Sequence, residues 1–397
     1  MIKIVLAILL LVYQIEGESV ASVDPTPVSC RPYSNDLDVI KSLPSKVSVV
    51  NEGNTCPTSD CAWINQQKQV TSLYLTYTTE SLQVYCLIHL RSLEIHSRTA
   101  WPVPVEISEL TNLTKLNLNI AGNRMTAGIG QLKMLQSMTF KADEITALPG
   151  YFGILRKLQY LFVDAPLENI PGFLVLIPLE TLILFRRSTY SSIPEDFFKR
   201  LNPSLRSLTI DITHLSSLDQ FLALTQLVSL TVYADKLKEF PWEFTQLTAL
   251  RQLNLDNNEL SSLPQNFSKN FDKLSFNLNQ FREIPSQILL NKNLSTLYMS
   301  NNLIADVSTL FQMGPPLKIL FLGSNNITTL PETVTSLSNS LESLALYNNK
   351  LTTVPAEVLV KMEKLRFLSL ERNPITPAEV ARLKAIFATN PRITVFF

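Results

Sequence analysis

The sequence predicts an α/β solenoid, with a curved parallel β-sheet on its concave side and short helices or turns on its convex side. Two observations lead to this fold class. One apolar pattern starts thirteen times between residues 90 and 374, at intervals of 21 to 26 residues, and an apolar residue followed by proline recurs in eight of these units. A chain of 397 residues would be large for a single ordinary core, whereas a repeat array grows by stacking.

The first residues have the pattern of a secretory signal peptide. Lys3 precedes an apolar run from Ile4 to Tyr13, and small residues follow at Gly17 and Ala21. We expect a signal peptide over residues 1–21 that is cleaved near residues 17 to 21, with an ordinary buried N-terminal strand as the alternative. The run is too short to span a bilayer, and no later apolar stretch reaches 18 residues. The mature chain is therefore predicted to be secreted and extracellular, without a transmembrane span.

All four cysteines lie in the first quarter of the chain, at Cys30, Cys56, Cys61 and Cys86. An even, clustered set in a secreted chain predicts two disulfides, and the sequence leaves three pairings open. A zinc site is the alternative, but the spacing of Cys56 and Cys61 is loose and the three histidines are scattered. We expect residues 22–89 to form a cysteine-containing N-terminal cap, with no metal and no other cofactor.

Each repeat has an apolar residue, further apolar residues at +3 and +5, and often Asn at +8. The clearest copy is Leu250-x-x-Leu253-x-Leu255-x-x-Asn258, and Val70 begins a degenerate opening copy. Alternation at +3 and +5 predicts a short strand with one buried and one exposed face, so neighbouring units must stack to cover their edges. The thirteen starts are Leu90, Leu113, Leu135, Leu158, Leu179, Leu205, Leu227, Leu250, Phe271, Leu294, Leu317, Leu341 and Leu365.

This signature resembles the leucine-rich-repeat family over residues 90 to 374, where we expect about thirteen repeats. The apolar-proline pairs resemble the short Ras-group class of these repeats, in which proline starts a short helical turn on the convex side. The pairs are Leu148-Pro149, Ile170-Pro171, Ile193-Pro194, Phe240-Pro241, Leu263-Pro264, Ile284-Pro285, Leu330-Pro331 and Val354-Pro355.

In the last six repeats the +8 residue is always asparagine. A buried amide can satisfy backbone groups of the turn that leaves each strand, and successive amides can form a ladder, so these residues are predicted to be structural. The first repeats have other residues at +8, which predicts less uniform turns there. The six are Asn258, Asn279, Asn302, Asn325, Asn349 and Asn373.

Residues 375–397 are predicted to form a helical C-terminal cap, and we expect the protein to be complete at Phe397. Thr376-Pro377-Ala378-Glu379 is a capping box with proline at the first helical position. One helical face then collects the apolar residues that would cover the last strand. They are Val380, Leu383, Ile386 and Phe387.

The sequence holds little that predicts catalysis. It has no G-x-S-x-G, no G-x-x-x-x-G-K and no H-E-x-x-H, and only ten glycines. A triad assembled from distant residues is the open alternative. Lys+Arg and Asp+Glu are equal at 34 each, so no net charge attracts nucleic acid. We therefore expect a protein that is not an enzyme, has no catalytic residues and has no nucleic-acid partner.

Four N-glycosylation acceptors are present, and by repeat register none occupies an exposed position of the concave sheet. That face would therefore remain clear of sugar. The acceptors are Asn112, Asn266, Asn293 and Asn326.

The resemblance implies that a ligand meets the concave sheet, whose exposed columns are +2, +4, +6 and +7. Aromatic and charged side chains collect there, which is the composition of an interface centre; cross-strand packing of the rings is the alternative. The main predicted site is Tyr160, Phe162, Asp164, Ile183, Phe185, Arg186, Asp211 and Tyr233. The secondary cluster is Tyr298, Phe321, Tyr347 and Phe367.

The predicted function is extracellular recognition of a protein or peptide ligand, in recognition or signalling, and the need for a membrane co-receptor stays open. The alternative is a structural, matrix or glycan-binding assembly protein.

Overall fold

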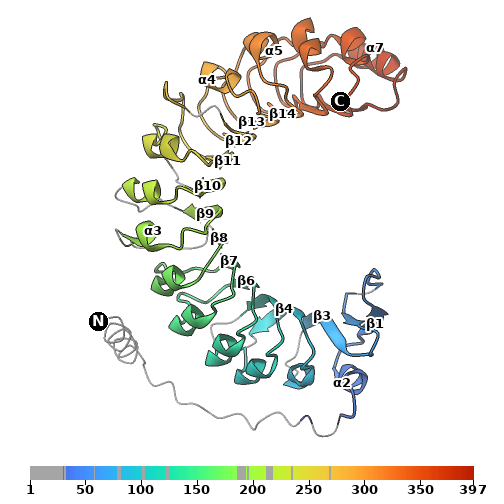
Figure 1. Cartoon of the computed structure of the whole chain (residues 1–397). Helices are drawn as coiled ribbons and strands as arrows, with labels where there is room; N and C mark the ends of the chain where they lie inside the picture. Colours follow the sequence, from blue (N-terminus) through green and yellow to red (C-terminus); the bar gives the residue numbers. More distant parts are fainter. Residues whose placement is uncertain are drawn as a thin grey trace. The chain divides into compact units, whose positions relative to one another are not determined.

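The computed structural model describes residues 30, 33–57, 59–77, 82–100, 103–121, 125–185, 194, 196–211, 218–233, 236–267 and 270–397. The predicted signal peptide lies outside these residues. The chain forms two compact units: unit 1 is Met1–Leu179 with Arg187–Ser191, and unit 2 is Glu180–Arg186 with Ser192–Phe397. In each unit, strands line one side and short helices line the other (Figure 1).

Unit 1 begins with the cap. Helix α2 (Asp36–Ser42) precedes strands β1 (Ser48–Asn51) and β2 (Cys61–Ile64), which pair in parallel. Disulfides join Cys30 to Cys86 and Cys56 to Cys61. The prediction of two disulfides is confirmed, and the structure selects one of the three pairings that the sequence left open.

The rest of unit 1 is a parallel array, apart from the antiparallel pairing of β2 with β3. β3 pairs in parallel with β4, so the degenerate copy that starts at Val70 is a true opening strand. The strands are β3 (Val70–Tyr77), β4 (Ser92–Ala100), β5 (Lys115–Ala121), β6 (Ser137–Ala142) and β7 (Tyr160–Asp164).

In unit 2 all of the described strand pairings are parallel. Each predicted repeat start in the two units has its own strand, β4 to β16, which begins two residues after that start. The strands of unit 2 are β8 (Thr181–Leu184), β9 (Ser207–Asp211), β10 (Ser229–Tyr233), β11 (Gln252–Asn254), β12 (Lys273–Ser275), β13 (Thr296–Tyr298), β14 (Ile319–Phe321), β15 (Ser343–Ala345), β16 (Phe367–Ser369) and β17 (Thr394–Phe396).

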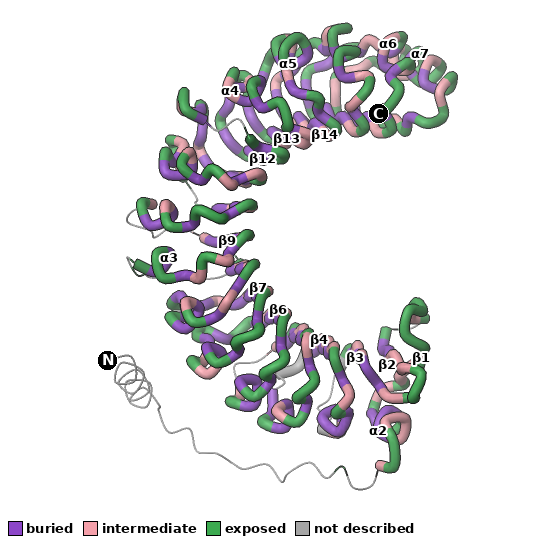
Figure 2. Tube along the Cα trace, in the orientation of Figure 1, coloured by how far each residue is buried: buried purple, intermediate pink, exposed green. Residues whose placement is uncertain are grey.

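The +3 and +5 residues form the core, as the alternation predicts. In β7, Leu161 and Val163 are buried, whereas Tyr160, Phe162 and Asp164 on the other face are partly exposed. The strands pair with their +3 residues in register, for example Leu297 with Leu320, and Leu320 with Leu344. Buried residues therefore recur from strand to strand through each unit (Figure 2).

The side opposite the sheet carries mostly single-turn helices. In unit 1 these are η1 (Leu82–Cys86), η2 (Val105–Glu109), η3 (Ala127–Gln131), η4 (Gly150–Ile154) and η5 (Gly172–Leu176). In unit 2 they are α3 (Phe197–Arg200), η6 (Asp219–Ala223), η7 (Trp242–Gln246), α4 (Ser286–Leu289), α5 (Ser308–Met313), η8 (Glu332–Leu337) and α6 (Ala356–Leu359).

The prolines start these turns as predicted, from the cap position before the first helical residue. Pro149 has extended backbone and is the cap that precedes η4, and its carbonyl accepts a hydrogen bond from the Phe152 N–H at 3.2 Å. A cap suits proline because this position needs an acceptor and not an N–H donor. Pro264 is followed by a turn without a helix, and Ile193 lies outside the described residues. The other capping prolines of the predicted pairs are Pro171, Pro241, Pro285, Pro331 and Pro355, and Pro104 caps η2 in the same way.

The asparagine ladder is confirmed, although it runs through the backbone and not from amide to amide. Asn302 accepts a hydrogen bond from the Phe281 N–H at 3.0 Å and donates to the carbonyls of Phe276 and Met299 at 2.9 and 3.1 Å. The same pattern joins Asn325 and Asn349 to the repeats before them. Each amide therefore ties its own turn to the preceding repeat.

The +7 column was predicted to be an exposed strand position, and in the last six repeats this is wrong. Strands β11 to β16 are three residues long and end at +4, and the +7 residue has a left-handed backbone with φ between 52° and 60°. This conformation belongs to the turn that presents the following asparagine to the core. The residues are Asn257, Leu278, Asn301, Ser324, Asn348 and Arg372.

Helix α7 (Pro377–Phe387) forms the C-terminal cap with the predicted capping residue, because the Thr376 side chain accepts a hydrogen bond from the Glu379 N–H at 3.3 Å. Leu383 and Phe387 are buried and the other two residues of the predicted face are half-buried. The structure adds a strand that was not predicted, β17, which pairs with β16. No helix among the described residues is long and apolar enough to cross a membrane.

Candidate binding surface on the open face of the sheet

The main predicted site is divided between the two units. Tyr160, Phe162 and Asp164 are in unit 1, on β7. Arg186 lies outside the described residues. The remaining four, Ile183, Phe185, Asp211 and Tyr233, are in unit 2. The predicted site is thus two surfaces, one in each unit.

The surface in unit 1 combines aromatic and charged side chains of β6 and β7. The Lys141 ammonium lies 5.4 Å from the centre of the Phe162 ring. Asp164 is opposite Lys141 in the register of the two strands. A ring with a cation over it and a carboxylate beside it can meet both apolar and charged groups of a partner.

The surface in unit 2 is formed over β9. The rings of Phe185 and Tyr233, which come from either side of this strand, meet edge to face with 6.1 Å between their centres. Asp211 is the partner of Tyr233 in the register, and Ile183 is the partner of Thr209. Phe185 keeps 38% of its surface exposed, so the ring pair packs together and still faces solvent.

The secondary cluster lies within unit 2. Tyr298 on β13 and Phe321 on β14 have ring centres 5.1 Å apart, and the Lys273 ammonium lies 5.2 Å from the Tyr298 ring. Phe367 on β16 pairs with Phe396 of the unpredicted strand β17, at 5.4 Å. Tyr298, Phe321 and Phe367 are half-buried, whereas Phe396 keeps 43% of its surface exposed.

Tyr347 lies in the same cluster, over a glycine of the neighbouring repeat. A Cβ atom at Gly323 would come within 2.2 Å of the Tyr347 ring. Any larger residue at position 323 would therefore displace the ring. The glycine fixes the place of Tyr347 on the open face.

A polar network on the same face of unit 2 was not predicted. The Asp256 carboxylate accepts hydrogen bonds from the Ser275 hydroxyl and the Asn277 N–H, both at 2.7 Å, and the Asn277 side chain accepts from the Ser300 N–H at 2.8 Å. Asp and Asn at +6 of consecutive repeats were the signal that could have indicated it. Because these groups hydrogen-bond to one another, the network holds neighbouring repeats together on this face.

The four predicted glycosylation acceptors lie outside the strands, so none is placed on the open face of the sheet. Asn112, Asn266 and Asn293 are exposed and Asn326 is half-buried. The described residues also contain no group of three or more His, Cys, Asp or Glu side chains that could hold a metal ion.

Comparison with known proteins finds leucine-rich repeats in this chain. Two models of the leucine rich repeat match it, at residues 249–271 and 315–375, and both regions belong to the array described above. The fold is a leucine-rich-repeat solenoid. The strand register extends the same unit to repeats that the family models do not match.

Among curated proteins, the chain is 26% identical over 252 residues to a volume-regulated anion channel subunit of Rattus norvegicus and 29% identical over 197 residues to keratocan of Gallus gallus. These matches cover 60% and 46% of this chain, but only 29% of the channel subunit and 53% of keratocan.

Solved structures share the fold. A leucine-rich-repeat protein of Leptospira interrogans has a TM-score of 0.60 and 25% identity, over 81% of this chain and 88% of that one. The ectodomain of the Arabidopsis thaliana receptor kinase GASSHO1/SCHENGEN3, solved in complex with CASPARIAN STRIP INTEGRITY FACTOR 2, has a TM-score of 0.59 and 21% identity, over 85% and 44%.

Proposed function

We propose that this leucine-rich-repeat protein acts outside the cell and binds a protein or peptide partner on the open face of its sheet, without a chemical step. The two disulfides support an oxidising compartment, because such bonds are rare in reducing ones. The signal-like residues 1–21 and the four glycosylation acceptors agree with this location.

The observation that carries the proposal is the aromatic face of unit 2. Tyr298, Phe321, Tyr347 and Phe367 come from four consecutive repeats. In support, Tyr298 is the register partner of Phe321, Phe367 lies on β16 of the same run of parallel strands, and Tyr347 lies over Gly323. Half-buried rings held by neighbours lose little side-chain entropy on binding, and interface energy concentrates in such anchors. Phe185 and Tyr233 give unit 2 a second ring pair of the same kind.

The test is affinity capture from extracellular extract with the purified chain, followed by binding measurements on single variants. Phe321→Ala and Phe185→Ala should each lower the affinity for the captured partner at least several-fold, because truncating an anchor residue costs about 2 kcal/mol or more of binding free energy. Glu332→Ala, on η8 of the helical side, is the matched control and should bind like the parent.

Three results would count against the proposal. Aromatic variants that fold normally and bind the partner at parental strength would remove the open face as the contact surface. Variants that lose binding and thermal stability together would assign the rings to packing. Concentration-dependent self-association without capture of a partner would favour the structural role.

A further inference from the structure

The open face of unit 1 contains a hollow that the repeat pattern did not indicate. Its volume is about 410 Å³, within the roughly 300 to 1,000 Å³ that ligand pockets occupy. It lies where the cap meets the first strands of the array. The lining residues used below are Glu52, Gly53, Trp63, Tyr74 and Glu94.

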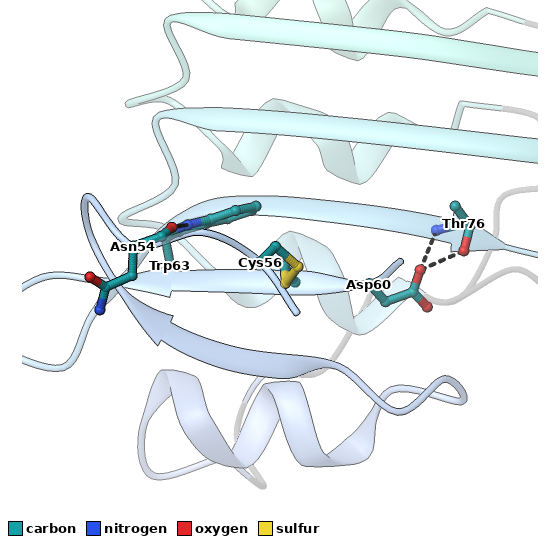
Figure 3. The surroundings of a disulfide bond; sticks show 6 residues. Asn54, Cys56, Asp60, Trp63 and Thr76 are labelled. Atoms are coloured by element: carbon teal, nitrogen blue, oxygen red, sulfur yellow. Dashed lines mark hydrogen bonds between the residues drawn. A yellow bond between two sulfur atoms is a disulfide. The ribbon is translucent and has the colours of Figure 1, made fainter. Parts of the chain in front are cut away.

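Two aromatic side chains stand in the wall of the hollow with their rings held in place. The Trp63 indole N–H donates to the Asn54 carbonyl at 3.0 Å, across the turn that follows β1 (Figure 3). The Tyr74 ring packs against the ring of His96, with 5.3 Å between their centres. Both residues are partly exposed, so each ring has surface that a ligand can meet.

Two carboxylates complete the wall. One has a hydroxyl as its hydrogen-bond partner and the other has an imidazole. Glu52 accepts a hydrogen bond from the Thr71 hydroxyl. Glu94, opposite Tyr74 in the register, lies 2.8 Å from Nε2 of His96.

Nδ1 of His96 in turn lies 3.3 Å from the side-chain nitrogen of Asn119. The tautomer with its proton on Nε2 satisfies both contacts of His96. Among the described residues, no lysine or arginine lies within ion-pair distance of Glu52 or Glu94.

We propose that this hollow binds the guanidinium group of an arginine side chain from the partner. Aromatic faces attract cations, and a guanidinium can also stack on a ring while its N–H groups meet carboxylates. Glu52 and Glu94 would supply the charge, and Trp63 and Tyr74 the stacking surfaces. The inference rests on the proposed function, because it names one chemical feature of the partner.

The turn that carries Glu52 is braced before any ligand binds. The Glu52 N–H donates to the Ile64 carbonyl at 3.1 Å, and the Asn54 N–H donates to the Asn51 carbonyl at 3.2 Å. Gly53 between them has φ of 88°, which favours glycine. The Cys56–Cys61 disulfide then ties the following loop to the start of β2 (Figure 3). A preformed wall lowers the ordering cost of binding.

In the experiment, N-acetyl-arginine amide is titrated into the folded chain, and the NMR signals of the tryptophan indole N–H groups are monitored. The chain has three tryptophans, and Trp63→Phe identifies the signal of Trp63. We expect that signal to shift and saturate at millimolar ligand. N-acetyl-citrulline amide, which is nearly the same shape without the charge, should cause no saturable shift.

Glu52→Gln and Glu94→Gln should each weaken the arginine ligand at least threefold. Glutamine keeps an oxygen that can accept the bonds from Thr71 and His96, so the change removes charge and preserves the fold. Glu144→Gln, at an exposed position of the same unit, is the matched control and should bind like the parent.

The proposal is overturned if the arginine ligand gives no saturable shift, if citrulline binds equally, or if both glutamine variants bind like the parent. Because the titration uses no natural partner, its failure leaves the test of the aromatic face unaffected. Conversely, a positive titration would still stand if the aromatic face of unit 2 proved not to bind a partner.

Discussion

Replacing Asn302 with alanine tests the ladder that joins the repeats of unit 2. The amide is 6% exposed and bonds to four backbone groups: the Phe281 N–H and the carbonyls of Phe276, Met299 and Ser300. The Ser300 carbonyl keeps a second donor, the Leu278 N–H at 2.9 Å. The Met299 carbonyl keeps a second donor, the Asn325 amide at 2.9 Å. Asn302→Ala therefore removes the side-chain partner from two groups that depend on it, the Phe281 N–H and the Phe276 carbonyl.

Leaving a buried backbone group unsatisfied costs about 1 to 3 kcal/mol. Two such groups predict a loss of about 2 to 6 kcal/mol in the free energy of unfolding, and water that enters the vacated space brings the value toward the lower end. Chemical denaturation measures the loss. Hydrogen exchange should show faster exchange around Phe281 and Leu303, because repeats open locally.

The matched control is Asn293→Ala in protein made without glycans. Asn293 is exposed and comes directly before the first residue of the same repeat, so its removal should change the unfolding free energy by less than about 0.5 kcal/mol. If Asn302→Ala unfolds at the parental midpoint and keeps parental exchange at Phe281, the ladder does not stabilise the array and the reasoning is refuted.

Three further predictions concern other parts of the chain. Reduction should speed hydrogen exchange in the cap before repeats of unit 2, because the Cys30–Cys86 bond closes a separation of 56 residues, worth about 4 kcal/mol of chain entropy; simultaneous loss of protection would contradict this. Gly323→Ala should displace the Tyr347 ring and cost about 1 to 3 kcal/mol, and an unchanged Tyr347 NMR signal would count against it. The Arg382 hydrogen bond lowers the pKa of Glu379 from 4.5 to about 2, so the stability that Glu379 contributes is present above pH 4.5 and lost as the pH falls toward 2. Exchange in α7 should follow that window, and Glu379→Gln should remove the dependence.

The repeat period predicted the array well because it records burial directly. Leu253 and Leu255 both face the core because side chains along an extended chain alternate between the two faces, so residues two apart lie on the same face. The same alternation placed Phe162 and Tyr298 on the open face. The ladder was predictable because a buried amide at a fixed position has few uses other than satisfying backbone groups.

Other features depend on contacts that no period records. β17 has only Thr394, Val395 and Phe396 to indicate it, too few residues for a pattern. The hollow needs Trp63 of the cap beside Tyr74, a proximity that comes from the antiparallel pairing of β2 with β3. The division of the main predicted site between two units could not be predicted either, because Phe162 and Phe185 both occupy exposed columns of neighbouring repeats.

The structure also explains how the first repeats manage without asparagine at +8. In unit 2 the strands from β11 to β16 end at +4, the chain turns through a left-handed residue at +7, and the amide at +8 satisfies the turn. In unit 1 the strands continue further: β5 runs to Ala121, which is itself the +8 residue, and β6 runs to Ala142 at +7. The parallel pairing of β5 with β6 continues along this stretch, where Ile120 is the register partner of Ala142. In the repeats of β5 and β6, the +8 position therefore lies in or next to a longer strand and not after a left-handed turn.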